Sequence, residues 1–368
     1  MVWWNVYLLS FLTALVFALV LTPVCRQIAL FFNVLDHPTV QEHKQHAKST
    51  PLLGGMAICL SWILTIAIGI ILSNTYLVGH HLDKSVAVNI GGIMKVSKEL
   101  VFICGGAVLI TLFGIYDDIH NMTAKTKFGG QIVVAILAVT WGGVKISMFI
   151  SNPVFTWCIS VLWIVVLMNA INFFDNMDGL AIGMAAIAFS LFAISAAVNV
   201  QYFVAVFGAT MAGAAFGFWF FNSSPAQIFM GDSGSHLIGY NLAVLGCLVT
   251  YYNPEFAPTK FSVLVPLFIL AIPLFDLCAV VVIRWKLGKP FYIGDHNHIS
   301  HRFQMMGLTK QNAVFVIHLM ALAIGLGVLP LLWGNIQTTI VCLIQAAVIL
   351  AIISILQYGV IKNKVAGK

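Results

Sequence analysis

The sequence has few charged residues. Asp, Glu, Lys and Arg make up 8% of it, whereas they make up about a quarter of a soluble domain. This shortage excludes an ordinary soluble protein and indicates that lipid is the solvent. Apolar residues instead account for 61% of the chain, in runs of about 20 residues, the length that crosses a hydrocarbon core. Such runs must be helical, because lipid offers no partners to unpaired backbone groups.

Other features are also missing. No CxxC pair occurs among the seven cysteines, which stand singly in or beside apolar runs, so neither a zinc cluster nor a disulfide framework is indicated. No internal repeat, low-complexity stretch or soluble domain is visible. The first apolar run has no basic segment before it and is long enough to span, which is unlike a cleavable signal peptide. We therefore predict one transmembrane domain over residues 1–368, with no separate soluble domain.

The predicted fold is all-α, a polytopic integral membrane bundle of about eleven helices. The fourth predicted span is the weakest, because Gly142, Gly143 and Lys145 interrupt it, and a ten-helix bundle is the alternative. The predicted spans are 3–24, 52–73, 98–116, 128–148, 154–171, 180–198, 200–221, 235–253, 261–284, 312–333 and 337–361.

The charges divide unevenly between the two sides of this bundle. With eleven spans, 13 of the 18 Lys and Arg residues fall on the side that holds the connection directly after each odd-numbered span. By the positive-inside rule this side is cytoplasmic. Nine of the 12 acidic residues lie at or near the same side. The sequence thus predicts a multi-pass protein of the inner (plasma) membrane with one polar site facing the cytosol.

Two adjacent acids, Asp117 and Asp118, end the third predicted span. Neighbouring carboxylates at a membrane boundary repel each other and are costly to bury unpaired, which a divalent cation or a lysine would relieve. Lys125 and Lys127 follow in the next short connection and could complement either the acids or a phosphate. A solvated helix end is the alternative for the acidic pair.

A second polar group lies at the end of the fifth predicted span. If that helix continues, Asn172, Asp175 and Asp178 are three residues apart and share one face. Gly179 would then permit the turn into the sixth span. As an alternative, Asp178 caps the sixth span by accepting backbone N–H bonds, but this does not explain the other two residues as well.

A third acid, Asp232, lies between Gly231 and Ser233 just before the eighth predicted span. Glycines around it would let the backbone approach a ligand closely. Hard cations such as Mg²⁺ are bound by one or two carboxylates together with phosphate oxygens of the substrate. Capping of the eighth span is the competing interpretation.

Three histidines and an arginine, His296, His298, His301 and Arg302, occur within seven residues before the tenth span. One helical turn would align His298 with His301. The group could bind Zn²⁺ or hold a phosphate, and the aspartates elsewhere favour a hard metal over zinc. A solvated basic loop is the alternative. For Asp276, inside the ninth span, we expect a structural ion pair.

The motifs together resemble the polyprenyl-phosphate N-acetylhexosamine-1-phosphate transferases, over residues from about 20 to 310. The resemblance is strongest to the undecaprenyl-phosphate GlcNAc-1-phosphate transferases, since the chain lacks the consecutive histidines of the phospho-N-acetylmuramoyl-pentapeptide translocases. In order, the motifs are Asp36-His-Pro, Pro51-Leu-Leu-Gly-Gly, Tyr116-Asp-Asp, Lys127-Phe-Gly-Gly-Gln, Asn169-Ala-Ile-Asn-Phe-Phe-Asp-Asn-Met-Asp-Gly-Leu, Phe229-Met-Gly-Asp-Ser-Gly-Ser, Pro273-Leu-Phe-Asp and Asp295-His-Asn-His-Ile-Ser-His-Arg.

The resemblance implies an enzyme that transfers GlcNAc-1-phosphate from UDP-GlcNAc to undecaprenyl phosphate and releases UMP. Such a reaction starts a cell-surface polysaccharide such as O-antigen, enterobacterial common antigen or teichoic-acid linkage. It also implies dependence on Mg²⁺, with Mn²⁺ as an alternative. The partners are a UDP-sugar, a polyprenyl phosphate and the membrane, with no nucleic acid, and a homodimer is compatible with the sequence.

The resemblance also implies roles for individual residues. Asp117 and Asp118 match acids that act on the lipid phosphate and near the metal, and Asp232 matches the principal metal ligand. Residues expected to take part directly in catalysis are Asp117, Asp118, Asp178, His298 and His301. Residues expected to bind substrate are His46, Lys48, Lys125, Lys127, Asn172, Asp175, Phe229, His296 and Arg302, with Phe229 against the uracil.

Two residues depart from the family pattern. Ser300 stands where a further histidine is usual, and His296 is a candidate substitute. Asn176 stands where the common pattern has glycine, which suggests a different turn before Asp178.

Two other functions compete with this one. A transferase of the same type could use another UDP-N-acetylhexosamine or UDP-MurNAc-pentapeptide, because these residues do not determine which sugar the donor carries. A cation-coupled transporter is more distant. Transporters bind their substrate near the midplane between inverted repeats, whereas here the acids cluster on one side and no repeat is seen.

Overall fold

The computed structural model describes residues 2–36, 49–73, 86, 88–89, 96–146, 152–252, 260–288, 290 and 297–366. Two short strands pair antiparallel, β1 (Leu35–Asp36) with β2 (Thr50–Pro51). The long elements are helices: α1 (Trp3–Phe31), α2 (Gly54–Ser73), α6 (Ser97–His120), α7 (Ala124–Thr140), α8 (Pro153–Phe174), α9 (Leu180–Val198), α10 (Tyr202–Asn222), α11 (Gly231–Leu248), η1 (Lys260–Leu264), α12 (Val265–Ile269), α13 (Ala271–Lys286), α14 (Ile299–Met305), α15 (Lys310–Gly325), α16 (Val328–Trp333) and α17 (Ile336–Ala366).

The described chain is an all-α, polytopic membrane protein, as predicted. Eight of its helical segments, with α15 and α16 taken together as Lys310–Trp333, are long and apolar enough to cross a membrane, or nine if the bent pair at 260–269 and 271–286 is one span. Each of the eleven predicted spans falls on one of these helices or on α7 or α11. These two do not meet the same criterion, since α7 has 17 residues and α11 begins with a polar segment. The number of crossings stays a prediction.

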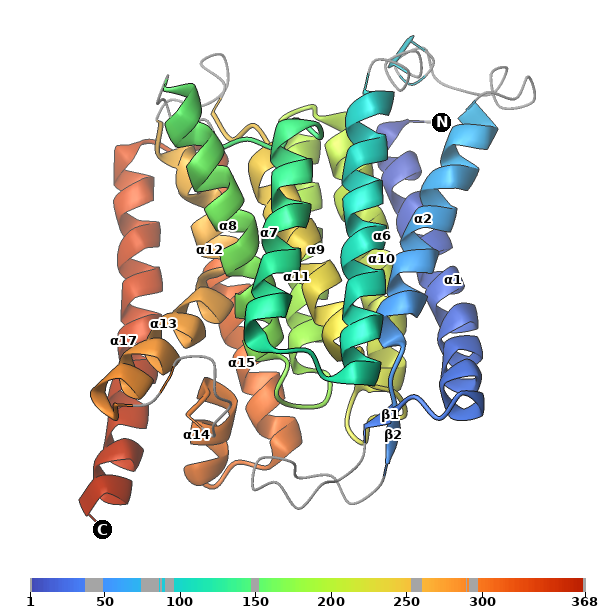
Figure 1. Cartoon of the computed structure of the whole chain (residues 1–368). Helices are drawn as coiled ribbons and strands as arrows, with labels where there is room; N and C mark the ends of the chain where they lie inside the picture. The colour runs from blue at the N-terminus through green and yellow to red at the C-terminus, as the bar shows by residue number, and fades with distance from the viewer. Residues whose placement is uncertain are drawn as a thin grey trace.

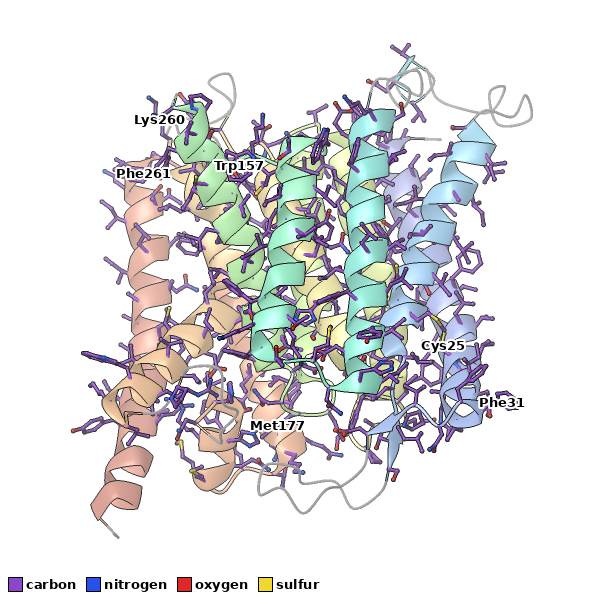
Figure 2. All side chains as sticks on the ribbon, viewed as in Figure 1. Cys25, Phe31, Trp157, Met177, Lys260 and Phe261 are labelled. Atoms are coloured by element: carbon purple, nitrogen blue, oxygen red, sulfur yellow. The ribbon has the colours of Figure 1, made fainter. Side chains whose placement is uncertain are left out.

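The helices run alternately up and down in Figure 1, so that consecutive connections lie at opposite ends. The α6–α7 and α8–α9 connections, the β1–β2 pair and α14 all lie at the lower end of this view. Met177 marks this end in Figure 2, whereas Trp157 and Lys260 mark the other. The predicted grouping of the polar connections at one end is therefore present, and we refer to it as the loop end.

Helix α11 lies inside the bundle, against α2, α6 and α8. Every residue from Ser233 to Leu245 is buried. Close approach makes this burial possible: a side chain at Gly114 of α6 would collide with the backbone of Ser233. A helix that is covered all round is typical of the core of a large bundle, and this one brings its polar first turn to the loop end.

The ninth predicted span is broken. Its two parts, 260–269 and 271–286, meet at 68°. Pro273 explains the position of the break, because proline has no N–H to bond the carbonyl four residues earlier. The second part, α13, therefore leaves the bundle axis and leads toward α14.

Three predicted boundaries were wrong in ways that affect the site. Helix α7 begins at Ala124 and ends at Thr140, because Gly142 and Gly143 follow and Gly143 has a φ of +66°. Helix α11 begins four residues before its predicted start, which places Asp232 in its first turn. Helix α8 ends at Phe174, so the predicted continuation through Asp175 and Asp178 does not form.

Candidate active site

Two carboxylates from different helices meet at one lysine at the loop end. Lys127 Nζ, on α7, lies 2.5 Å from Asp117 Oδ2 of α6 and 2.6 Å from Asp232 Oδ2 of α11. Asp117 is 2% exposed, and its other oxygen accepts a hydrogen bond from the backbone N–H of Met122 at 2.7 Å. Lys127 thus lies beside Asp117, which precedes it by ten residues, and also beside Asp232, which is more than 100 residues away in the sequence.

Helix α8 completes this group with an amide. Asn172 Nδ2 donates to Asp232 Oδ1 at 2.8 Å and to Ser235 Oγ at 2.9 Å. Both oxygens of Asp232 therefore face polar side chains from other helices, and not the backbone N–H groups of α11. The N-cap of α11 is Met230, with no side-chain hydrogen bond. Capping of this helix by Asp232, the alternative considered above, is wrong.

Asp118 provides the cap instead. Its Oδ1 accepts from the backbone N–H of Asp232 at 2.8 Å and its Oδ2 from that of Ser233 at 3.3 Å. The first N–H groups of a helix have no partner within it and attract negative charge. Gly231, with a φ of +69°, leaves room for this approach, because a side chain there would collide with Asp118. Asp118 thus holds the start of α11 in place beside Asp117.

The predicted ridge of Asn172, Asp175 and Asp178 on one helix face is wrong, because α8 ends before the two acids. Asp175 follows the last helical residue, and Asp178 accepts a hydrogen bond from the backbone N–H of Ala226 at 3.1 Å. Asp178 does not cap α9, whose N-cap is Gly179. Gly179 has a φ of +73° and makes the predicted turn.

Within this local group, the carboxylates of Asp117, Asp118 and Asp232 outnumber the one lysine. Burial, together with the carboxylates of Asp232, Asp178 and Asp118, raises the pKa of Asp175 to about 8. Within the described residues no three acidic, histidine or cysteine side chains are already grouped as ligands of one ion. Two carboxylate oxygens do converge, from Asp117 and Asp232, and Mg²⁺ uses only one or two carboxylates when substrate phosphates supply the rest. The donor set therefore fits Mg²⁺.

The histidine segment is held by Asp276 of α13. His298 Nδ1 lies 2.7 Å from Asp276 Oδ2, the backbone N–H of Ile299 donates to Asp276 Oδ1 at 2.7 Å, and an Arg302 nitrogen lies 3.8 Å from that oxygen. Asp276 is 1% exposed. The predicted structural ion pair for Asp276 is confirmed. The rings of His298 and His301 lie side by side, with centroids 6.4 Å apart.

The two departures from the family pattern touch each other. The Ser300 hydroxyl, on α14, donates to the side-chain carbonyl of Asn176, whose amide donates to Phe173 O at 3.0 Å. Asn176 directly follows Asp175, so this contact joins the histidine segment to the acidic turn. Asn176 also bonds the end of α8 through Phe173 O, and the different turn suggested by this departure stays a prediction.

The remaining predicted site residues either lie outside the described residues or take no part in the contacts of Lys127 with Asp117 and Asp232. His46, Lys48 and His296 lie outside the described residues. Lys125 is exposed, and since it is two residues from Lys127 it does not share its helix face. Phe229 pairs through its backbone with the segment entering α2: its N–H donates to Pro51 O at 2.8 Å, and its carbonyl accepts from Gly54 N at 3.1 Å.

The sequence interpretation missed one polar side chain beside this group. His236 lies one turn after Asp232, buried to 2% exposure, and its Nε2 is 2.9 Å from Gln131 Nε2. A histidine four residues after a candidate metal ligand, in an otherwise apolar run, was the available signal.

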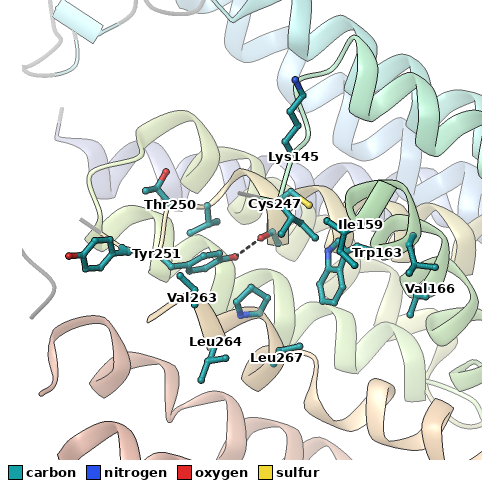
Figure 3. Close-up of a pocket in the computed structure, with 16 residues that line it drawn as sticks. Lys145, Ile159, Trp163, Val166, Cys247, Thr250, Tyr251, Val263, Leu264 and Leu267 are labelled. Carbon is teal, nitrogen blue, oxygen red and sulfur yellow. Dashed lines mark hydrogen bonds between the residues drawn. The ribbon is translucent and has the colours of Figure 1, made fainter. Parts of the chain in front are cut away.

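A cavity of about 400 Å³ lies at the other end of the bundle (Figure 3). Its walls are mostly apolar, from the first half of α8, the end of α11, and η1 and α12, and include Trp163 and Tyr251. Gly246 in this wall is 14 residues from Asp232, or about 21 Å along α11. The cavity is therefore separate from the acids.

The chain is also similar in sequence to known proteins. Residues 100–250 match the family described as glycosyl transferase family 4. A probable undecaprenyl-phosphate N-acetylglucosaminyl 1-phosphate transferase of Bacillus subtilis is 32% identical over 84% of this chain and 80% of its own length.

Two further relatives match at lower identity. A decaprenyl-phosphate N-acetylglucosaminephosphotransferase of Mycolicibacterium smegmatis is 28% identical over 95% of this chain and 88% of its own. A phospho-N-acetylmuramoyl-pentapeptide-transferase of Bacillus subtilis is 25% identical over 83% of this chain and 90% of its own. Helices, motifs and relatives agree that the chain belongs to the polyprenyl-phosphate N-acetylhexosamine-1-phosphate transferase superfamily.

Proposed function

We propose that this membrane-bound phosphosugar transferase moves GlcNAc-1-phosphate from UDP-GlcNAc to undecaprenyl phosphate, giving undecaprenyl-diphospho-GlcNAc and UMP. The observation that supports it is the meeting of Asp117 and Asp232 at Lys127, at the end of the bundle where the polar connections gather. Enzymes that transfer phosphoryl groups commonly combine acids that bind Mg²⁺ with a cationic side chain that binds phosphate. The Bacillus subtilis relative is named for the same donor sugar.

In the proposed mechanism an oxygen of the lipid phosphate attacks the phosphorus that carries the sugar. The new P–O bond forms as the bond to UMP breaks, and UMP leaves with the electron pair. A phosphate monoester has its second pKa near 6 and is largely dianionic at neutral pH, so no base is required. Mg²⁺, when held by Asp117 and Asp232, would supply charge neutralisation at the diphosphate.

The described residues have separate tasks in this proposal. Asp117 and Asp232 hold the cation, Asn172 orients Asp232, and Lys127 moves from the two carboxylates to the phosphates when substrate binds. His298, His301 and Arg302 bind the donor's diphosphate and also offset charge that develops there in the transition state. A covalent aspartyl-phosphate is the alternative; radiolabelled sugar phosphate retained on the protein without acceptor lipid would contradict direct attack.

We further propose that the protein spans the inner membrane and that its loop end faces the cytosol. Its support is the excess of Lys and Arg in the connections at that end. UDP-GlcNAc supplied only to the outside of inverted membrane vesicles should be consumed, and the same addition to right-side-out vesicles should not. Consumption only in right-side-out vesicles would reverse the assignment.

The direct test uses purified protein, undecaprenyl phosphate and Mg²⁺ with UDP-GlcNAc, a second UDP-N-acetylhexosamine, UDP-MurNAc-pentapeptide and UDP-glucose in parallel. We expect UMP and a lipid product heavier by GlcNAc-phosphate with UDP-GlcNAc, and neither with UDP-glucose or after chelation of the metal. A product from the pentapeptide donor alone would overturn the choice of sugar. No lipid product with any donor would overturn the proposed reaction.

A further inference from the structure

Three polar side chains meet inside the bundle, deeper than the acids. Asn169 Nδ2 of α8 donates to Gln131 Oε1 of α7 at 2.5 Å, and Gln131 Nε2 lies 2.9 Å from His236 Nε2 of α11. Gln131 and His236 are each 2% exposed. We refer to Asn169, Gln131 and His236 as the buried triad.

Each contact in the buried triad joins a donor to an acceptor. Because the Gln131 amide nitrogen can only donate, His236 accepts at Nε2 and is therefore the neutral imidazole with its proton on Nδ1. Asn169 Nδ2 also donates to Val165 O of its own helix at 2.8 Å. The order from Asn169 through Gln131 to His236 is thus fixed by the chemistry of the three groups.

The buried triad repeats the site one helical turn away. Residues three or four apart on a helix share a face, and four residues correspond to about 6 Å along the axis. We refer to the residues that meet at the loop end, Asp117, Lys127, Asn172 and Asp232, as the acidic group. Each member of the triad is paired in this way with a residue of the acidic group on the same helix. The pairs are Lys127 with Gln131 on α7, Asn172 with Asn169 on α8, and Asp232 with His236 on α11.

This repetition indicates a positioning role. Apolar contacts are not directional, whereas a chain of buried, satisfied hydrogen bonds favours one register of the three helices that it joins. Polar side chains inside a membrane bundle are costly and commonly mark function. We propose that the buried triad fixes α7, α8 and α11 so that Lys127, Asn172 and Asp232 meet. The inference rests on the proposed metal-dependent function.

The test measures Mn²⁺ binding by electron paramagnetic resonance as well as UMP release, in the full-length protein. Gln131→Met and His236→Leu remove the hydrogen bonds and keep similar volume. We expect both to weaken Mn²⁺ binding and lower kcat by about 10- to 100-fold, the usual effect of removing a group that orients a metal ligand. His236→Gln keeps an acceptor for Gln131 and should recover most of both losses.

Asn241 supplies the matched control. It is a fully buried amide on α11 that donates to Leu237 O of its own helix at 3.1 Å. Asn241→Leu should leave Mn²⁺ binding and kcat unchanged. An equal loss in this variant would assign the effect to general weakening of the bundle and would overturn the proposal.

A double variant separates positioning from independent damage. If the buried triad acts as a unit, Gln131→Met with His236→Leu should lose no more than either change alone. Additive losses, or Mn²⁺ binding that stays normal in both single variants, would contradict it. Gln131→Glu, which is isosteric but cannot donate when ionised, replaces Gln131→Met if the latter does not fold. If wild type binds Mn²⁺ but uses no UDP-GlcNAc, the proposed donor fails while the affinities still test the triad.

Discussion

The acidic group and the histidine segment lie at the same end of the bundle but are held differently. The acids stand on the long helices α6 and α11, and their oxygens face Lys127 of α7 and Asn172 of α8. The histidines stand at the start of α14, which has seven residues. That short helix is joined to other elements by Asp276, Asn176 and Gln357, the last donating to Ile299 O at 3.2 Å.

The difference concerns what fixes each group. A helix of seven residues is not stable alone, so the position of His298 and His301 depends on contacts with other elements, through the polar anchors and the buried side chains of Ile299 and Phe303. The positions of the acids are instead fixed by the packing of the four long helices α6, α7, α8 and α11. Substitutions in the acidic group should therefore change metal binding and the chemical step. Substitutions at the anchors of α14 should chiefly change donor binding.

The largest effect is expected at Asp232. Asp232→Asn keeps the shape of the side chain but removes the charge that faces the proposed cation, so UMP release should fall by at least about 1,000-fold. The thermal unfolding temperature should change little, because Asp118 still caps α11. The measurement is UMP release alongside a melting curve in the same detergent. Activity close to wild type at saturating Mg²⁺ would remove Asp232 from the proposed metal site.

A change at Lys127 should separate binding from turnover. Lys127→Met removes a positive charge 2.5 and 2.6 Å from two carboxylates. Mn²⁺ should bind more tightly, because less positive charge opposes it, while UMP release falls about 100-fold for lack of a phosphate partner. Lys310→Met, at an exposed position at the start of α15, is the matched control and should match wild type. Weaker Mn²⁺ binding in Lys127→Met would mean that the lysine supports the metal instead of the phosphates.

The anchor of the histidine segment should show the opposite pattern. Asp276→Asn removes the charge shared by His298 and Arg302, and a hydrogen bond to a charged group contributes about 1.5–3 kcal/mol. KM for UDP-GlcNAc should rise by about tenfold or more, with unchanged Mn²⁺ affinity. Steady-state kinetics and Mn²⁺ titration on one preparation would check both. A loss confined to Mn²⁺ affinity would show that the two groups are not separate.

The smallest effect is expected at the contact between α14 and the acidic turn. Ser300→Ala removes a hydrogen bond between neutral groups, which contributes about 0.5–1.5 kcal/mol, so kcat/KM should fall by about two- to tenfold. Asn176→Ala should have a similar effect, and the double variant no more than either. Ser190→Ala, whose hydroxyl bonds its own helix α9, is the control. Additive losses would show that Ser300 and Asn176 act independently.

Much of this arrangement could be predicted from the sequence. Apolar runs located every long helix of the described chain, because lipid requires such runs to be helical, but they did not indicate the short helix α14. Alternation of spans then placed Asp117 and Asp232 at one end. Lys125 and Lys127 were expected to complement either the acids or a phosphate, and Lys127 lies beside the acids. The bend before α13 was not predicted, although Pro273 marks it.

The contacts between helices could not be predicted. Helices such as α9 and α11 are buried on nearly all sides, so their apolar residues do not reveal which face meets which neighbour. The bond between Gln131 and His236 and the capping of α11 by Asp118 both depend on that rotation. The end of α8 was missed because the polar residues after Phe174 keep a three-residue spacing that also fits a helix.

The central claim is that Asp117 and Asp232, on two helices far apart in sequence, hold one cation. Iron-directed cleavage tests it: Fe²⁺ is exchanged into the purified protein, and peroxide with ascorbate then cuts the backbone close to the bound ion. We predict cuts near residues 117 and 232 in the same preparation, both suppressed by excess Mg²⁺ and both lost in Asp232→Asn. Cleavage at only one of these positions, or at both in Asp232→Asn, would contradict a shared ion.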